Sequence, residues 1–166
     1  MATNENTPFL KDHEISENRR IRRDELPKPY PDPEAWDSNL AAALASDPRR
    51  KENYEKWLNA SKSVDVDYLP TRLDVENVSR CNYRCTMCQV SEWGPKFQRA
   101  GDMSFEDFKQ LVDDQYGLME IKLHGMGEPL LGRDKFFDMV RYARAKHIWV
   151  RTNSNGSLFH IRDNYK

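Results

Sequence analysis

Cysteine is absent from this chain except in one short stretch, and long apolar runs are absent altogether. The stretch RCNYRCTMCQ at residues 80–89 holds all three cysteines, Cys81, Cys85 and Cys88. No run reaches the roughly 18 apolar residues of a transmembrane helix, and the N-terminus, MATNENTPFL, lacks the apolar centre of a signal peptide. We therefore expect a cytoplasmic protein without membrane contact, in which thiols stay reduced. Clustered cysteines in that compartment indicate metal binding or redox chemistry before disulfides.

An excess of either charge is also missing. Lysine and arginine total 26 against 27 acidic residues, a formal net charge of −1, so no nucleic-acid partner is expected. The mean hydropathy of −0.90 indicates that part of the 166-residue chain adds nothing to a core. That part is residues 1–32, which we predict to be a poorly ordered tail. Its basic run at 19–23 is either a docking site for an acidic partner or, as charge patterning favours, a solvated segment.

Residues 33–70 predict a helical N-terminal extension. The segments 32–46 and 47–61 each begin with Asp-Pro, a common helix entry. Each carries an aromatic and aliphatic stripe at helical spacing, which is more often core than site. The two expected stripes are Trp36, Leu40, Ala43 and Leu44 in the first helix, and Tyr54, Trp57 and Leu58 in the second.

From residue 71 onward the pattern alternates between strand and helix. Alternation of this kind predicts an α/β fold with parallel strands joined by right-handed crossovers. Ser104 is a candidate N-cap, with Met103 and Phe108 placed to contact each other across the first turn. The expected strands are 72–79, 118–125 and 147–153, and the expected helices are 102–115, 134–146 and a third that starts at 154.

The unusual residues all follow an expected strand. The cysteines come after the first strand, His124-Gly-Met-Gly-Glu-Pro129 ends the second, and Thr152-Asn-Ser-Asn-Gly156 ends the third. In parallel α/β proteins the loops at the carboxyl ends of the strands build the active site. The three loops therefore predict one composite site, although asparagine and glycine are also ordinary turn formers.

Three thiolates suit zinc, copper(I) or an iron–sulfur cluster, because all of these accept soft ligands. Structural zinc wants four protein ligands, and His124 is the only plausible fourth. A cubane cluster with three cysteines instead has one iron without a protein ligand, which is a position for chemistry. The residues alone leave both readings open.

The segment Cys81-Asn-Tyr-Arg-Cys85-Thr-Met-Cys88 resembles the signature of the radical S-adenosylmethionine (radical SAM) superfamily. The resemblance implies a [4Fe-4S] cluster on the three cysteines, with the amino and carboxylate groups of S-adenosylmethionine on the fourth iron. It also implies reductive cleavage to a 5'-deoxyadenosyl radical that takes a hydrogen atom from the substrate. The surrounding sequence is most similar to the branch that carries a C-terminal SPASM domain, which includes peptide-modifying and cofactor-building enzymes.

By the same resemblance, Gly125, Gly127 and Glu128 match the glycine-rich motif that holds the methionine amino group. Glycine lets a backbone approach a ligand closely, and a carboxylate suits an ammonium group. Met87 stands where the family often has an aromatic residue near the adenine; it is apolar and polarizable. Trp93 is expected either to cover the cluster loop or to anchor it.

The resemblance implies a partial (β/α) barrel, of which residues 71–166 supply the first three βα units. We expect a piece of a longer enzyme, with an unpaired third strand and exposed apolar surface unless another chain completes it. A flavodoxin- or ferredoxin-type electron donor is implied, and the substrate is unknown, possibly a peptide or a cofactor precursor. The alternative is a non-catalytic module that binds zinc or an iron–sulfur cluster.

Overall fold

A three-stranded parallel sheet organises the part of the chain that follows the N-terminal helices. Its order is β1-β2-β3, formed by Arg72–Val75, Glu120–Leu123 and Trp149–Arg151. The strands are aligned so that Arg72 lies beside Glu120, and Glu120 beside Trp149. The prediction of parallel strands is confirmed. The computed structural model describes residues 33–61, 63–92, 101–159 and 161.

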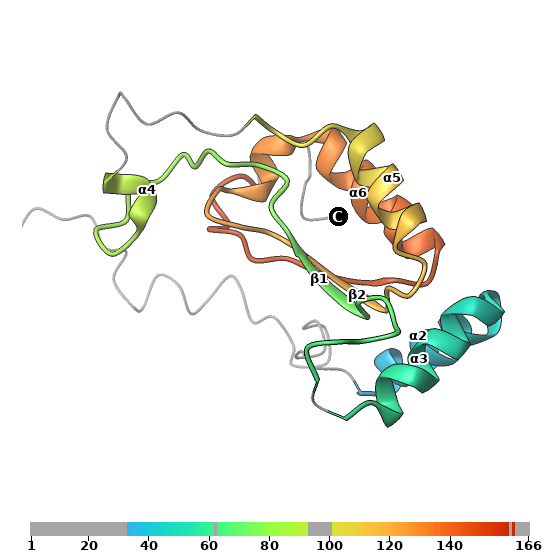
Figure 1. Cartoon of the computed structure of the whole chain (residues 1–166). Helices are drawn as coiled ribbons and strands as arrows, with labels where there is room; N and C mark the ends of the chain where they lie inside the picture. Colours follow the sequence, from blue (N-terminus) through green and yellow to red (C-terminus); the bar gives the residue numbers. More distant parts are fainter. Residues whose placement is uncertain (1–32, 62, 93–100, 160, 162–166) are drawn as a thin grey trace, which may run out of the picture. The chain divides into compact units, whose positions relative to one another are not determined.

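Helices α5 (Phe105–Asp114) and α6 (Asp134–Ala145) pack side by side on one face of this sheet (Figure 1). The predicted cap of α5 is confirmed, since the N–H of Asp107 donates to Ser104 Oγ at 3.0 Å. Ile121 and Leu123 alternate along β2 toward these helices and are fully buried. The buried core comprises Val75, Phe108, Val112, Leu118, Ile121, Leu123, Leu130, Phe136, Met139, Ala143 and Ile148.

The opposite face of the sheet is charged. Glu120 is 2% exposed, and its carboxylate lies 3.2 Å from the guanidinium of Arg72 and 3.1 Å from that of Arg151. Lys122 and Asp74 form a further pair at 3.6 Å. β1 and β3 are edge strands within the described residues, as expected, but this face does not present the apolar surface that an incomplete barrel suggests.

The elements are shorter than the sequence predicts. The first strand ends at Val75 and not at residue 79, because the carbonyls beyond it bond to loops: Asn77 O accepts from Met103 N, and Arg80 O from Glu128 N. The expected third helix is not seen in residues 154–159, which form turns with Gly156 at a φ of 74°. The remainder of that range is largely outside the described residues, as are the expected tail and Trp93.

Two helices precede the sheet, α2 (Pro33–Ser46) and α3 (Pro48–Asn59). The expected stripe of α3 is wrong, since Trp57 and Leu58 are 41% and 60% exposed. Its buried side chains are the polar Arg50 and Asn53, and each of them forms hydrogen bonds with backbone groups of other segments. The Asn53 amide donates to Leu69 O at 3.0 Å and accepts from Leu69 N at 2.7 Å, which fixes the chain just ahead of β1.

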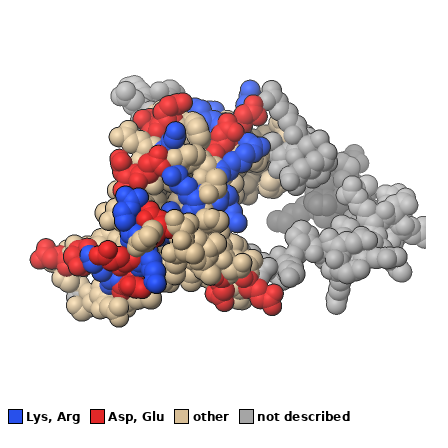
Figure 2. Space-filling view, turned by 90° about the vertical axis from the view of Figure 1, so that its right-hand side faces the viewer, with Lys and Arg blue, Asp and Glu red and all other residues tan. Residues whose placement is uncertain are grey.

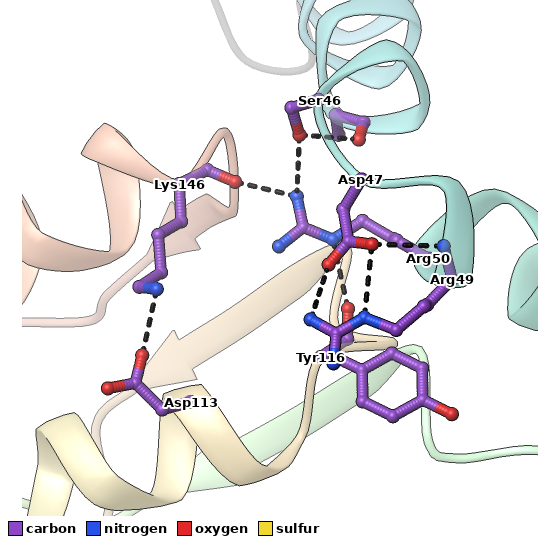
Figure 3. Close-up of polar contacts among 8 residues, drawn as sticks. Ser46, Asp47, Arg49, Arg50, Asp113, Tyr116 and Lys146 are labelled. Atoms are coloured by element: carbon purple, nitrogen blue, oxygen red, sulfur yellow. Dashed lines mark hydrogen bonds and ion pairs between the residues drawn. The ribbon is translucent and has the colours of Figure 1, made fainter.

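Arg50 joins α3 to the segments that lead into β2 and β3 (Figure 3). Its guanidinium donates to Tyr116 O, ahead of β2, at 3.0 Å and to Lys146 O, ahead of β3, at 2.7 Å. Burial lowers the pKa of Arg50 by disfavouring its charged form. The neighbouring Arg49 instead forms an exposed pair with Asp47 at 2.9 Å. The Arg49 guanidinium also lies 4.8 Å from the centre of the Tyr116 ring, but only Arg50 donates hydrogen bonds to the segments ahead of β2 and β3.

Replacing Arg50 with methionine should lower the free energy of unfolding by about 2–3 kcal/mol, because two half-buried carbonyls lose charge-assisted hydrogen bonds. Urea unfolding followed by circular dichroism measures the loss. The matched control is Arg141→Met, which removes only an exposed pair with Asp138 at 2.9 Å and should cost less than about 1 kcal/mol. Equal losses in the two variants would contradict the role of Arg50.

Positive and negative side chains are interspersed on the face drawn in Figure 2. This mixture agrees with the nearly balanced composition of the chain. Of the helices in the described part of the chain, none combines the length and the apolar character needed to cross a membrane.

Candidate functional site

The cysteines occupy a loop between β1 and the short helix α4 (Gln89–Glu92). All three are free thiols; Cys85 is exposed, and Cys81 and Cys88 are half-buried. A turn closes the loop, in which Cys88 N donates to Cys85 O at 3.0 Å. The N–H of Tyr83 points at Cys81 Sγ, 3.4 Å away. Amide donors around a sulfur are typical of sites that stabilise thiolates.

The cysteine side chains do not converge on one point. Among the described residues, no three His, Cys, Asp or Glu side chains are close enough together to hold a metal ion. His124 is therefore not gathered with the cysteines into the ligand set that the zinc alternative requires. Three uncrosslinked thiols within eight residues nevertheless fit an iron–sulfur cluster by donor chemistry, and their side chains would have to turn toward each other to hold it.

The glycine-rich loop lies against the segment that leads into the cysteines. A Cβ on Gly127 would be 2.0 Å from Val78 O and 2.7 Å from Arg80 O. A Cβ on Gly125 would be 2.4 Å from the side chain of Glu76. Gly127 is thus required for packing, because the atoms that a Cβ would meet belong to the backbone. At Gly125 the neighbour is an exposed side chain that can turn aside. Contact of these glycines with a ligand stays a prediction.

Glu76 is a site residue that the sequence reasoning missed. It follows β1 directly and is exposed, and its Oε1 accepts the N–H groups of Met126 and Gly127 at 2.6 and 3.3 Å. The signal in the sequence is weak, because Glu76 lies inside the expected strand 72–79, as an acidic residue near the end that leads to the cysteines. Its carboxylate orients the glycine-rich loop and lies at the same edge of the sheet as the cysteines.

Glu128, in contrast, is 2% exposed and is engaged inside the protein. Its Oε1 accepts from Leu130 N at 3.0 Å and from Ser154 Oγ at 2.8 Å, and its Oε2 accepts from Asn155 N at 2.8 Å. The carboxylate therefore connects the glycine-rich loop with the loop after β3. Its expected contact with an ammonium group stays a prediction.

The loop after β3 also reaches the cysteine loop. Thr152 Oγ1 donates back to Leu123 O at 2.8 Å, which ties the start of this loop to β2. Farther along, the Asn155 side chain donates to Asn82 Oδ1 at 3.0 Å, and the Asn82 amide donates to Ser157 Oγ at 2.9 Å. The three loops thus meet at the carboxyl ends of the strands, as the order of the strands predicts.

Two further candidates lie around these loops. Met87 is 94% exposed on the cysteine loop, so its side chain is available to a planar ligand such as a purine. His124 is half-buried at the end of β2. The structure therefore places every predicted site residue on one of the three loops or at a strand end beside them, without bringing the sulfurs together.

Comparison with known proteins agrees with this arrangement. The chain is 35% identical over 89 residues to the tungsten-containing aldehyde ferredoxin oxidoreductase cofactor-modifying protein of Pyrococcus furiosus, covering 52% of this chain and 24% of that protein. It is 30% identical over 110 residues to mycofactocin maturase MftC of Mycolicibacterium smegmatis, covering 66% and 25%. The chain thus spans about a quarter of the length of these relatives. A family model described as the radical SAM superfamily matches residues 77–165, and the chain belongs to that superfamily.

Proposed function

We propose that this chain supplies the cluster- and S-adenosylmethionine-binding part of a radical SAM enzyme. The observation that carries the proposal is the meeting of three loops, one with three free cysteines, at the carboxyl ends of a parallel sheet. Residues 71–166 form the first βα units of a partial barrel, and residues 33–70 form a helical extension before it. The ion-paired face of the sheet would then line the interior of that barrel.

Cys81, Cys85 and Cys88 are the proposed ligands of a [4Fe-4S] cluster. The cluster would supply one electron to the sulfonium of S-adenosylmethionine, whose C–S bond breaks to give methionine and a 5'-deoxyadenosyl radical for hydrogen abstraction. The role of the chain itself is to hold the cluster and S-adenosylmethionine in the right position relative to each other. The turn that joins Cys85 and Cys88 keeps two of the ligands on one short segment.

The proposed cofactor-binding residues are Gly125, Gly127, Glu128 and Met87, and Glu76 joins them. An ammonium group only donates hydrogen bonds, so it needs carbonyl or carboxylate acceptors. Of the two glutamates beside the glycine-rich loop, Glu76 is exposed and Glu128 is buried with three donors. Glu76 is therefore the better placed carboxylate, and Glu128 acts by shaping the loop.

The substrate is proposed by class only. One relative is named as a cofactor-modifying protein and the other as a maturase. These names favour a peptide or a cofactor precursor as the substrate of the whole enzyme. A flavodoxin- or ferredoxin-type protein is the proposed electron donor.

The test is anaerobic reconstitution of this chain with iron and sulfide, followed by reduction and electron paramagnetic resonance. We expect a [4Fe-4S] spectrum that changes when S-adenosylmethionine is added, because one iron has no protein ligand. Cys85→Ser should abolish at least nine-tenths of this signal, whereas Thr86→Ala, on the same loop, should keep it. A colourless protein that takes up one zinc ion and no cluster would overturn the proposal in favour of the zinc module.

A further inference from the structure

One side chain outside the expected site residues points at a proposed cluster ligand. The Asn155 amide nitrogen lies 3.9 Å from Cys81 Sγ and 3.0 Å from Asn82 Oδ1. Because Asn82 follows Cys81 in the chain, the same amide group contacts the ligand and its neighbour. Cys81 Sγ also faces the N–H of Tyr83 at 3.4 Å, so two nitrogen donors surround this sulfur.

The orientation of this amide is fixed by its other end. Asn155 Oδ1 accepts from the N–H of Ser157 at 3.0 Å, and the Ser157 hydroxyl also donates to it at 2.7 Å. A backbone N–H can only donate, so the atom that faces Ser157 must be the oxygen. The NH2 group therefore faces Cys81. The Ser157 hydroxyl in turn accepts from the Asn82 amide at 2.9 Å, which closes a ring of hydrogen bonds.

The backbone of Asn155 is held as well. Its N–H donates to the buried carboxylate of Glu128 at 2.8 Å, and Ser154 Oγ donates to the same carboxylate at 2.8 Å. A buried carboxylate with several donors is costly to displace, because the lost hydrogen bonds are not replaced by water. The amide is thus positioned by the protein and does not depend on the cluster for its place.

We propose that Asn155 is a positioning residue that tunes the cluster by donating a hydrogen bond to the Cys81 thiolate. The inference rests on the proposed function. Reduction adds negative charge to the cluster, part of which lies on its sulfur ligands. A donor beside one of those sulfurs stabilises the reduced state more than the oxidised state, and so raises the reduction potential.

The experiment is a redox titration of the reconstituted chain, followed by the electron paramagnetic resonance signal of the reduced cluster. Asn155→Asp keeps the size and shape of the side chain, replaces the donor with an acceptor and should shift the midpoint potential to a more negative value. Asn155→Ser keeps the backbone hydrogen bond to Glu128 but withdraws the amide, and should shift the potential in the same direction by a smaller amount. Circular dichroism shows whether each variant is folded.

The matched control is Asn153→Asp, which makes the same charge change at an exposed position two residues away. It should shift the potential less than Asn155→Asp does. Equal shifts would reduce the effect to general electrostatics and overturn the inference, as would an unchanged potential in both Asn155 variants. In those two results the proposed function would still stand. A wild-type chain that takes up no cluster would overturn the proposed function, and this inference with it.

Discussion

Gly127→Ala is expected to lower the free energy of unfolding by about 3–4 kcal/mol. The new methyl group would be 2.0 Å from Val78 O and 2.7 Å from Arg80 O. Both are backbone atoms, and Glu128 N already donates to Arg80 O at 2.9 Å, so neither can move without separating the two loops. The glycine-rich loop must then leave the segment that precedes Cys81. Urea unfolding, followed by circular dichroism, measures the loss.

The matched control is Gly101→Ala, because a Cβ at Gly101 would meet no atom of the described residues within 4 Å. This variant should change the free energy of unfolding by less than about 1 kcal/mol, and it can even stabilise the protein by restricting the unfolded chain. The reconstituted Gly127 variant should also lose most of its cluster signal, since the cysteine loop loses its support. A Gly127→Ala protein as stable as the Gly101→Ala protein would refute this account of the glycine-rich loop.

The sequence was sufficient to predict the order of the elements and the meeting of three loops at the carboxyl ends of the strands. Alternating strands and helices impose parallel pairing, and Ile121 and Leu123 reveal the buried face of β2 by their spacing. The cap at Ser104 is equally local, because it needs only its own side chain and the N–H three residues on. These features depend on near neighbours in the chain, and such features are the ones that sequence patterns record.

The contacts that shape the site join residues far apart in the chain, and patterns do not record them. Glu76 and Met126 are 50 residues apart, and Asn155 and Cys81 are 74 apart. The sequence does not predict the burial of Arg50 and Asn53, because charged and polar side chains are seldom buried. Both are buried here because each forms hydrogen bonds with backbone groups that would otherwise have no partner.

Glu128 makes contacts inside the protein that its sequence motif does not reveal. Its place in the glycine-rich motif suggests a ligand to an ammonium group, but its carboxylate accepts three hydrogen bonds within the protein. Glu128→Ala should therefore lower the free energy of unfolding by about 3 kcal/mol, since it leaves one buried donor on Leu130 and two part-buried donors on Ser154 and Asn155 without their acceptor. Thermal and urea unfolding both measure this loss.

Two further variants test whether the charge and both oxygens of the Glu128 carboxylate are needed, and not only a side chain of that size. Glu128→Gln keeps one acceptor oxygen but turns an NH2 group toward a donor, so it should recover only part of the lost stability. Glu55→Gln, at an exposed position on α3, should cost less than about 0.5 kcal/mol, because the ion pair it removes is 4.0 Å long and solvated. If Glu128 instead serves only a ligand, Glu128→Ala will be as stable as wild type and will lose only the spectral response to S-adenosylmethionine. If it organises the loops, stability falls without any ligand present, and the reduction potential shifts as in the Asn155 variants because Asn155 loses its anchor.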